Sequence, residues 1–253
     1  MTGPINTTVA SLTSRSLLGR RRTVVLLLLP LALLGLCVLA RILGSLNPEI
    51  ARELDGALPA HLLTAFGIAI LMPLLTLIAG TGAIGPEIDE GSIVYLLAKP
   101  LSRHSIVVTK LLVAFMVVVG FGVVPIFVAG IVLTGEVGEV TLAFATGALV
   151  AGSAYSSLFL LLAVVTRNAV VVGLIYALVW ESLVGGLVPG AQALSVQQWS
   201  LAVVQQVLGD SARRLEVESA VGFGTAVILL ALVVIAATFY AGRRLQTLRI
   251  SEA

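Results

Sequence analysis

The sequence predicts an all-α membrane protein with six transmembrane helices, and three observations support this fold class. First, 58% of the residues are hydrophobic and only 11% are charged, whereas soluble domains carry about 25% charged residues. Such a chain cannot cover itself with a polar surface, so lipid is expected to be its main solvent. Second, six apolar runs reach the roughly 20 residues that a membrane-spanning helix needs. Third, basic residues gather on alternate sides of these runs.

The six predicted spans are joined by connections of unequal length. The spans cover about 23–40, 62–84, 106–133, 140–165, 169–188 and 220–241. The connection at 166–168 is short enough to make a tight helical hairpin, and the connection near 133–139 is also short. Two longer stretches, 43–61 and 189–218, lie on the side of the membrane opposite to the N-terminus.

The first apolar run has a second interpretation as a signal peptide. Its basic flank at 20–22 fits, but about twenty residues precede the run, and Val38-Leu39-Ala40 is a poor cleavage site. We therefore expect a retained helix. Cys37 lies inside it and is expected to be a small membrane-buried hydrophobic residue. One cysteine excludes an intrachain disulfide, and the sequence contains no Cys/His cluster for a metal.

Lysine and arginine counts predict the orientation, because short cytoplasmic loops are enriched in both residues. With a cytoplasmic N-terminus, eleven basic residues face the cytoplasm and four face outward. The four are Arg41, Arg52, Arg213 and Arg214. Six spans also return the basic tail to the cytoplasm. We therefore expect a single transmembrane domain over 1–253, with a cytoplasmic amphipathic segment at 1–22, six spans within 23–241 and a cytoplasmic tail at 242–253.

The segment 86–105, PEIDEGSIVYLLAKPLSRHS, has the densest mixture of charges in the chain. Acids come first, and the apolar patch 92–98 can form about two helical turns that end at Pro100. Acids before the patch and Lys99 after it suit the helix dipole. One interpretation is a short cytoplasmic helix that fits a groove on a soluble partner. The other is a solvated turn whose basic residues, Lys99 and Arg103, contact lipid headgroups.

The stretch 191–208 has many apolar residues with glutamines among them. It is too short and too polar to span a bilayer. We expect a re-entrant or interfacial helix before the sixth span, with Trp199 at the depth where its ring is apolar and its N–H reaches water. A loose loop is the alternative.

The motif GTGAIGPEIDEGSIVYLLAKPLSR at 80–103, followed by Ile106 and Lys110, resembles the first cytoplasmic loop of ABC-2-type transporter permeases. It is most similar to a bacterial subfamily that includes multidrug permeases and the copper-site maturation permease of nitrous oxide reductase. The resemblance implies a bacterial inner-membrane, multi-pass location. It also implies two copies of a separate ABC ATPase subunit and a second permease subunit, identical or homologous.

The same resemblance implies that 92–98 is the coupling helix, which docks on the ATPase between the second and third spans. Glu87 and Arg103 would form a polar hinge that passes ATPase movement into the spans. An amphipathic helix at about 9–22 would precede the first span. The implied ATPase-coupling residues are Glu87, Asp89, Glu90, Gly91, Ser92, Ile93, Tyr95, Leu96, Leu97, Lys99, Pro100 and Arg103.

The chain contains no GxxxxGK[ST] phosphate loop, so it is expected to have no nucleotide site and not to be an enzyme. No cofactor is expected in this chain, and ATP and Mg²⁺ would bind to the partner ATPase. No nucleic-acid partner is expected. The small residues at 152–157 could suggest an intramembrane serine protease, but no His or Lys lies deep in another span to activate a serine. Close helix packing explains them better.

Glu181 is the one acid predicted to lie inside a span, where a charge costs about 2.5–3.5 kcal/mol at the helix centre. It is a candidate substrate or gating contact, together with Tyr155 and Trp180. The alternative is a structural hydrogen bond to a hydroxyl such as Tyr155, Ser156 or Ser157. Lys110 and Arg41 lie near span ends and are expected to snorkel. His61 and His104 are expected to contact lipid headgroups.

These expectations combine into an ABC exporter permease that moves a hydrophobic or amphipathic substrate, a drug or a lipid-like molecule, out of the cell. Efflux of this kind would confer antibiotic resistance. An ion-coupled secondary transporter or channel is an alternative, but it would need paired charges or broken helices at the midplane. A membrane enzyme and a non-transporting assembly subunit are further alternatives. A P-loop ATPase that co-purifies with the chain would favour the permease.

Overall fold

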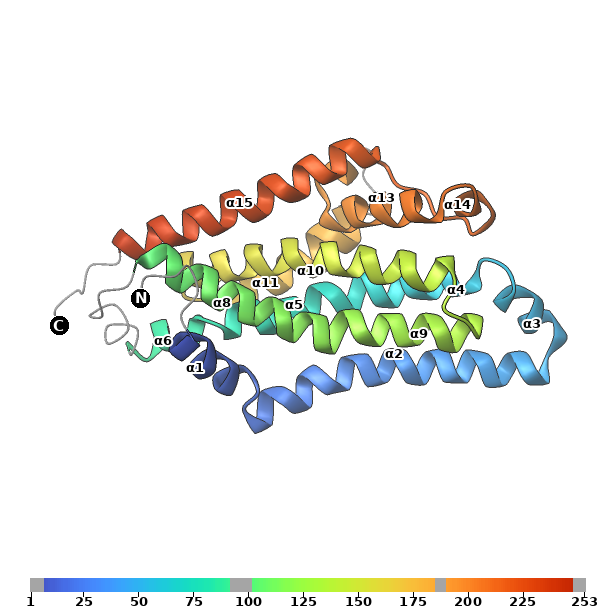
Figure 1. The fold of residues 1–253 in the computed structure, drawn as a ribbon, viewed down its shortest axis with the longest axis horizontal. Coiled ribbons are helices and arrows are strands. Elements are labelled where there is room, and N and C mark those ends of the chain that lie inside the picture. Colours follow the sequence, from blue (N-terminus) through green and yellow to red (C-terminus); the bar gives the residue numbers. More distant parts are fainter. Residues whose placement is uncertain (1–6, 92–101, 185–189, 248–253) are drawn as a thin grey trace.

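The structure is a computed structural model, and it describes residues 7–91, 102–184 and 190–247. Within these ranges every regular element is a helix. The helices lie side by side along the long axis of one elongated bundle (Figure 1). The all-α prediction is therefore confirmed for the described part of the chain.

The helices carry the labels of Figure 1. Their bounds are α1 (Thr7–Leu17), α2 (Arg20–Leu46), α3 (Pro48–Leu54), α4 (Leu58–Leu62), η1 (Leu63–Leu71), α5 (Met72–Gly82), α6 (Gly85–Asp89), α8 (Arg103–Val118), η2 (Val119–Val123), α9 (Val124–Thr134), α10 (Glu139–Val165), α11 (Ala169–Ile175), η3 (Tyr176–Val184), η4 (Ala191–Leu194), α13 (Val196–Leu208), α14 (Ser211–Arg214) and α15 (Phe223–Thr247).

Five helical runs among the described residues are long and apolar enough to cross a membrane. They are Thr23–Leu46, Leu58–Ile88, Arg103–Thr134, Glu139–Val165 and Phe223–Leu245. The predicted fifth span, 169–188, is described only as far as Val184. It consists of α11, with seven residues, and η3, with nine. The predicted 43–61 connection is also largely helical, since it contains the end of α2 together with α3 and α4.

Two of the long runs contain a π-helical section just before a proline. Pro73 follows η1 and Pro125 follows η2, each near the start of the next α-helix. Proline has no N–H and its ring collides with the carbonyl four residues earlier, so the regular i→i−4 ladder cannot continue through it. Widening the preceding turns is a common way to accommodate this defect.

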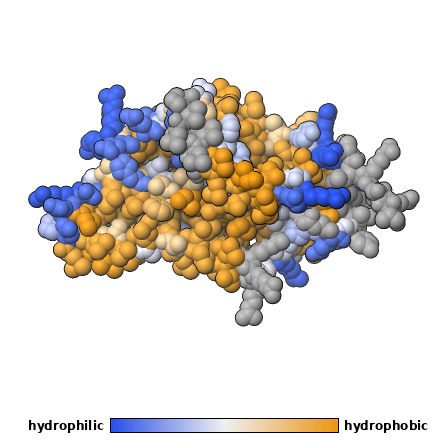
Figure 2. Space-filling view, turned by 180° about the vertical axis from the view of Figure 1, so that it is seen from behind, coloured by the Kyte–Doolittle hydropathy of each residue, from blue (hydrophilic) through white to orange (hydrophobic). Residues whose placement is uncertain are grey.

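The two ends of the bundle differ in charge. We call the end that holds α1, α6 and the last turns of α15 the basic end, and the end that holds α3, α4 and α14 the acidic end (Figure 1). Figure 2 shows hydrophilic residues at both ends and a hydrophobic belt between them. The first and last described helices, α1 and α15, both reach the basic end, and the location of the two termini remains a prediction.

Helix α10 lies at the centre of the bundle and packs against α5, α9, α13 and α15. Small residues allow these close contacts, as is usual between helices in a membrane. A Cβ at Gly80 would lie 2.9 Å from Phe159 Cβ, and one at Gly152 would lie 2.9 Å from Val118 Cγ1. The prediction that the small residues of 152–157 serve helix packing is therefore confirmed at Gly152. Cys37 is fully buried, as expected.

The stretch 191–208 is neither a loose loop nor a helix lying at the surface. It forms η4 and α13, and most of α13 is buried against α10 and α15. The expectation that the Trp199 N–H reaches interfacial water is wrong, because the ring is only 4% exposed and its Nε1 donates to the Ala193 carbonyl at 2.8 Å. The prediction of a short helix before the last span is correct.

Candidate functional site

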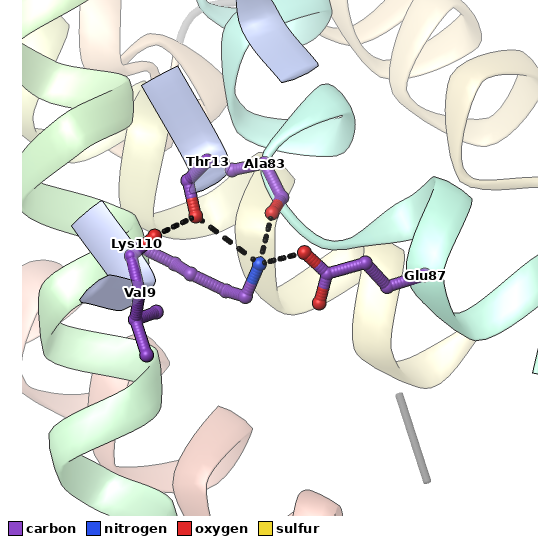
Figure 3. A network of polar contacts seen from close by, with 5 residues as sticks. All are labelled: Val9, Thr13, Ala83, Glu87 and Lys110. Carbon is purple, nitrogen blue, oxygen red and sulfur yellow. Dashed lines mark hydrogen bonds and ion pairs between the residues drawn. The ribbon is translucent and has the colours of Figure 1, made fainter. Parts of the chain in front are cut away.

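A cluster of polar groups at the basic end joins three parts of the chain around Lys110. The Lys110 Nζ donates to Glu87 Oε1 at 2.6 Å, to the Ala83 carbonyl at 2.7 Å and to Thr13 Oγ1 at 3.3 Å. Thr13 Oγ1 in turn donates to the Val9 carbonyl at 2.9 Å. Figure 3 shows these groups converging on the ammonium nitrogen from different helices.

The burial of Lys110 explains why it needs this cluster. Its side chain is 0% exposed, whereas the side chain of Glu87 is 27% exposed. A buried charge is tolerated only when it is paired and its hydrogen-bonding capacity is used. A lysine ammonium has three N–H donors, and each of them has an acceptor here. The expectation that Lys110 snorkels is therefore wrong: α1 covers it, and it forms a buried ion pair.

The Lys110 cluster acts as a joint between α1, the α5–α6 connection and α8. Ala83 is the C-cap of α5, so its carbonyl is one of the four that an α-helix leaves without an intrahelical partner. Glu87 lies in α6, which leads into the segment predicted to contain the coupling helix. The ion pair between Glu87 and Lys110 therefore links α6 directly to α8.

The predicted coupling residues are only partly described. Glu87 is in the joint, and Arg103 begins α8 directly after Ser102, whose side chain caps that helix by accepting from Ser105 N at 3.1 Å. Glu90 is exposed, and Gly91 has φ 70°, a conformation that favours glycine. Asp89 ends α6. Ser92, Ile93, Tyr95, Leu96, Leu97, Lys99 and Pro100 lie outside the described residues, so their assigned role remains a prediction.

A second polar cluster surrounds Glu181, which is 0% exposed. Its Oε1 accepts from Tyr176 Oη at 2.8 Å and from Val196 N at 3.1 Å. Its Oε2 accepts from Ser195 Oγ at 2.5 Å and from Gln197 N at 3.3 Å. Glu181 therefore joins η3 to the beginning of α13.

The alternative prediction that Glu181 makes a structural hydrogen bond to a hydroxyl is confirmed, but the hydroxyls are those of Tyr176 and Ser195. Among the described residues, Tyr155 and Ser156 have buried hydroxyls without a well-formed hydrogen bond, and Ser157 Oγ donates to the Ala154 carbonyl. Trp180 is half-buried beside Glu181 in η3. The roles of Glu181, Tyr155 and Trp180 in substrate contact or gating remain predictions.

The actual partners of both clusters were missed by the sequence analysis, although two signals were present. A lysine inside an apolar run is a functional-site hypothesis by default, and Lys110 is the fifth residue of the predicted third span, 106–133. Ser195 followed by Gln198 matches the capping-box pattern that marks a helix start. Thr13 left no comparable signal, because a single threonine in an amphipathic helix is unremarkable.

One of the two histidines, His104, also differs from expectation. His104 packs on Phe239 of α15, with 5.6 Å between ring centroids, instead of facing headgroups. The Arg243 guanidinium lies 4.8 Å from the centroid of the same Phe239 ring. His61 Nε2 is 3.3 Å from Glu216 Oε2 at the acidic end. Arg41 donates to the Leu133 carbonyl at 3.3 Å, which ties the end of α2 to α9.

Apolar membrane-length helices, two charged ends and buried polar joints define a multi-pass membrane protein whose helices are tied together at specific points. The sequence profile of a family described as ABC-2 family transporter protein matches residues 8–244. The chain belongs to this family, as its 80–110 motif indicated. Permeases of this family are transport subunits without a nucleotide-binding domain of their own, and they normally work with an ABC ATPase. No curated protein matches the chain.

Proposed function

We propose that the chain is the membrane subunit of an ATP-driven exporter, with the basic end in the cytoplasm and segment 86–105 docked on a separate ATPase subunit. Two permease chains would pair with two ATPase subunits. The substrate would be hydrophobic or amphipathic, a drug or a lipid-like molecule, and the complex would sit in a bacterial inner membrane. The Lys110 cluster is the observation on which this proposal mainly depends.

The Lys110 cluster supports the proposal because the Glu87–Lys110 ion pair connects the proposed docking segment directly to α8. Glu87 precedes the predicted coupling helix by five residues, and its carboxylate contacts Lys110 inside α8. A movement of the coupling helix would displace Glu87, and the ion pair would transmit that displacement to α8 and, through Thr13, to α1. A solvated turn that only contacts headgroups would not need a buried ammonium at its base.

The course of the chain supports six crossings. In Figure 1, α2 leads from the basic end to the acidic end, α5 returns, α8 and α9 lead out, and α10 returns. Helix α15 also ends at the basic end. A further outward passage must therefore lie between α10 and α15, and this part of the chain contains α11, η3 and α13. An even number of crossings keeps both termini in the cytoplasm.

The positive-inside rule supports the same orientation. The described helix ends and turns at the basic end carry Arg15, Arg103, Arg167, Arg243 and Arg244. Carboxylates predominate at the other end, including Glu49, Glu53, Asp55, Glu136, Glu139 and Asp210. ATP is available only in the cytoplasm, so the segment that receives force from an ATPase must lie on this side.

The first test is whether a P-loop ATPase co-purifies with the tagged chain from its native membrane. We expect the ATPase to be retained by the wild type and lost by Leu97→Arg, because a charge on the apolar patch would prevent it from filling a groove. Glu87→Gln is expected to keep the ATPase bound. It should lower transport of a rhodamine-class dye into inverted vesicles at least tenfold, with ATP hydrolysis reduced less than threefold.

Glu139→Gln is the matched control, because Glu139 is an exposed carboxylate at the acidic end, where it accepts a hydrogen bond from Ser211 Oγ. It should leave both hydrolysis and dye transport within twofold of the wild type. Absence of any bound ATPase, or ATP-independent dye transport driven by an ion gradient, would refute the proposal and favour the secondary transporter.

A further inference from the structure

Helix α13 begins in the protein interior with every one of its first backbone donors paired. The first N–H groups of an α-helix have no intrahelical acceptor and are costly to bury unpaired. Ser195 N donates to the Gln192 carbonyl at 3.1 Å, and Gln198 N donates to Ser195 Oγ at 3.4 Å. The N–H groups of Val196 and Gln197, which lie between them, both donate to the Glu181 carboxylate.

Glu181 therefore caps α13 from a different segment of the chain, because it accepts two of the three N–H groups at 196–198. With the Ser195 hydroxyl, α13 and its N-cap supply three of the four donors that the carboxylate accepts. The fourth is the hydroxyl of Tyr176, five residues earlier in the same helix. A π-helix makes i→i+5 backbone bonds, so residues five apart lie close to one face. The π-helical geometry of η3 thus brings Tyr176 and Glu181 together.

Tyr155 of α10 adds a group that this arrangement does not use. Its side chain is 0% exposed, and its hydroxyl makes no well-formed hydrogen bond among the described residues. The hydroxyl nevertheless lies beside the Glu181 carboxylate and the Gln197 backbone, close enough for weak contacts of poor hydrogen-bond geometry. Its ring is stacked on Phe159 with 6.0 Å between centroids. A buried hydroxyl without a partner raises the free energy of the state that contains it.

We propose that Glu181 is a latch that holds α13 against the fifth span, and that the Tyr155 hydroxyl is the donor that replaces those of α13 when the helix moves away. In the docked state the carboxylate is saturated by α13 and Tyr176. When α13 moves away, the Glu181 carboxylate loses the hydrogen bonds from Ser195, Val196 and Gln197. The Tyr155 hydroxyl then donates to the carboxylate oxygen atoms that are left without a donor.

The latch would control a helix that fills the space between α10 and α15. Helix α13 packs on both of them, and a Cβ at Gly147 of α10 would overlap with Val204 Cγ2 of α13. The close fit means that α13 is either seated or displaced, with little room for intermediate positions. The two arrangements of the Glu181 hydrogen bonds would then correspond to two discrete positions of α13.

Accessibility of Ser200 in α13 tests the latch. Ser200 is 0% exposed, and its hydroxyl donates only to the Gln197 carbonyl in the same helix, so Ser200→Cys preserves size and local bonding. The variant is made in a Cys37→Ala background and labelled in membrane vesicles, intact and permeabilised, with a membrane-impermeant maleimide. We expect Glu181→Gln to accelerate labelling at least tenfold, because an amide cannot accept all four donors.

Tyr155→Phe is expected to act in the opposite direction. It removes the unpaired hydroxyl from the docked state and the replacement donor from the displaced state, so labelling should slow at least threefold. Ser195→Ala and Tyr176→Phe each remove one donor and should accelerate labelling about threefold, which keeps the test informative if Glu181→Gln does not fold. Glu139→Gln should label at the wild-type rate.

Wild-type labelling rates in Glu181→Gln, Ser195→Ala and Tyr176→Phe, all with normal elution profiles, would overturn the latch. Unchanged or faster labelling in Tyr155→Phe would overturn the role of Tyr155. The measurement uses the permease chain alone, without ATP or substrate. A failure of the latch is therefore distinguishable from a failure of the ATPase partnership.

Discussion

Replacing Lys110 with methionine is expected to lower the free energy of unfolding by about 3 kcal/mol. Removing one partner of a buried ion pair typically costs about 3–5 kcal/mol, because the other charge stays behind without compensation. Glu87 is 27% exposed, so some water reaches its carboxylate and the loss should lie at the low end of this range. The Ala83 carbonyl would also lose its Lys110 donor. Reversible unfolding of the purified chain in mixed micelles measures the change.

Two further variants separate the ion pair from general damage to the bundle. Glu87→Gln in the Lys110→Met background should cost little more than Lys110→Met alone, since the uncompensated charge is then gone. Arg15→Gln removes an exposed cation from α1, the helix that carries Thr13, and should change stability by less than about 0.5 kcal/mol. Additive losses in the double variant would show that Lys110 and Glu87 do not act as a pair.

Gly80→Val is expected to prevent the native packing of α5 on α10. A Cβ at Gly80 would meet the Phe159 Cβ at 2.9 Å, and the Ser156 carbonyl and the Leu160 amide nitrogen at 3.2 Å each. Two of these neighbours are backbone atoms of a helix and cannot rotate away. Overpacking typically costs about 1–3 kcal/mol, occasionally more. Gly80→Ala should fall in that range, whereas Gly80→Val should abolish recovery of monodisperse protein.

Gly120→Ala is the matched control for Gly80, because no described residue outside its own stretch of helix lies within 4 Å of the position its Cβ would take. Alanine is favoured over glycine in a helix by about 0.5–1 kcal/mol, so this variant should be neutral or slightly stabilising. Size-exclusion profiles and unfolding in mixed micelles report both effects. Normal recovery of Gly80→Val would show that the α5–α10 contact is looser than the structure indicates.

The long apolar runs were predictable because hydrophobicity at a scale of about 20 residues is a property of the sequence alone. The bounds of α10, Glu139–Val165, agree within one residue with the predicted fourth span, and the turn at 166–168 is as short as expected. The position of α1 was predicted less well. Its helix ends at Leu17 and α2 begins at Arg20. Val9, Thr13 and Leu17 are buried on one face of α1, and Thr13 Oγ1 accepts a hydrogen bond from Lys110.

The hydrogen-bond partners of isolated polar residues in the spans could not be predicted from the sequence pattern. Glu181 was expected to bond hydroxyls on the fourth span, yet its donors come from α13 and Tyr176. Ser195 follows Glu181 by 14 residues in the chain, so the sequence pattern does not show which donors reach the carboxylate. Lys110 presents the same difficulty, since the helix that covers it lies about 97 residues earlier in the chain.

The sequence by itself determined the all-helical membrane class, the family and the segment expected to meet an ATPase, because composition and a local motif do not depend on neighbours in space. Only the tertiary structure decided that Lys110 joins three segments and that Glu181 caps the buried start of α13. A charge inside apolar surroundings must be paired. Which group pairs with it depends on the approach of helices that are distant in the sequence.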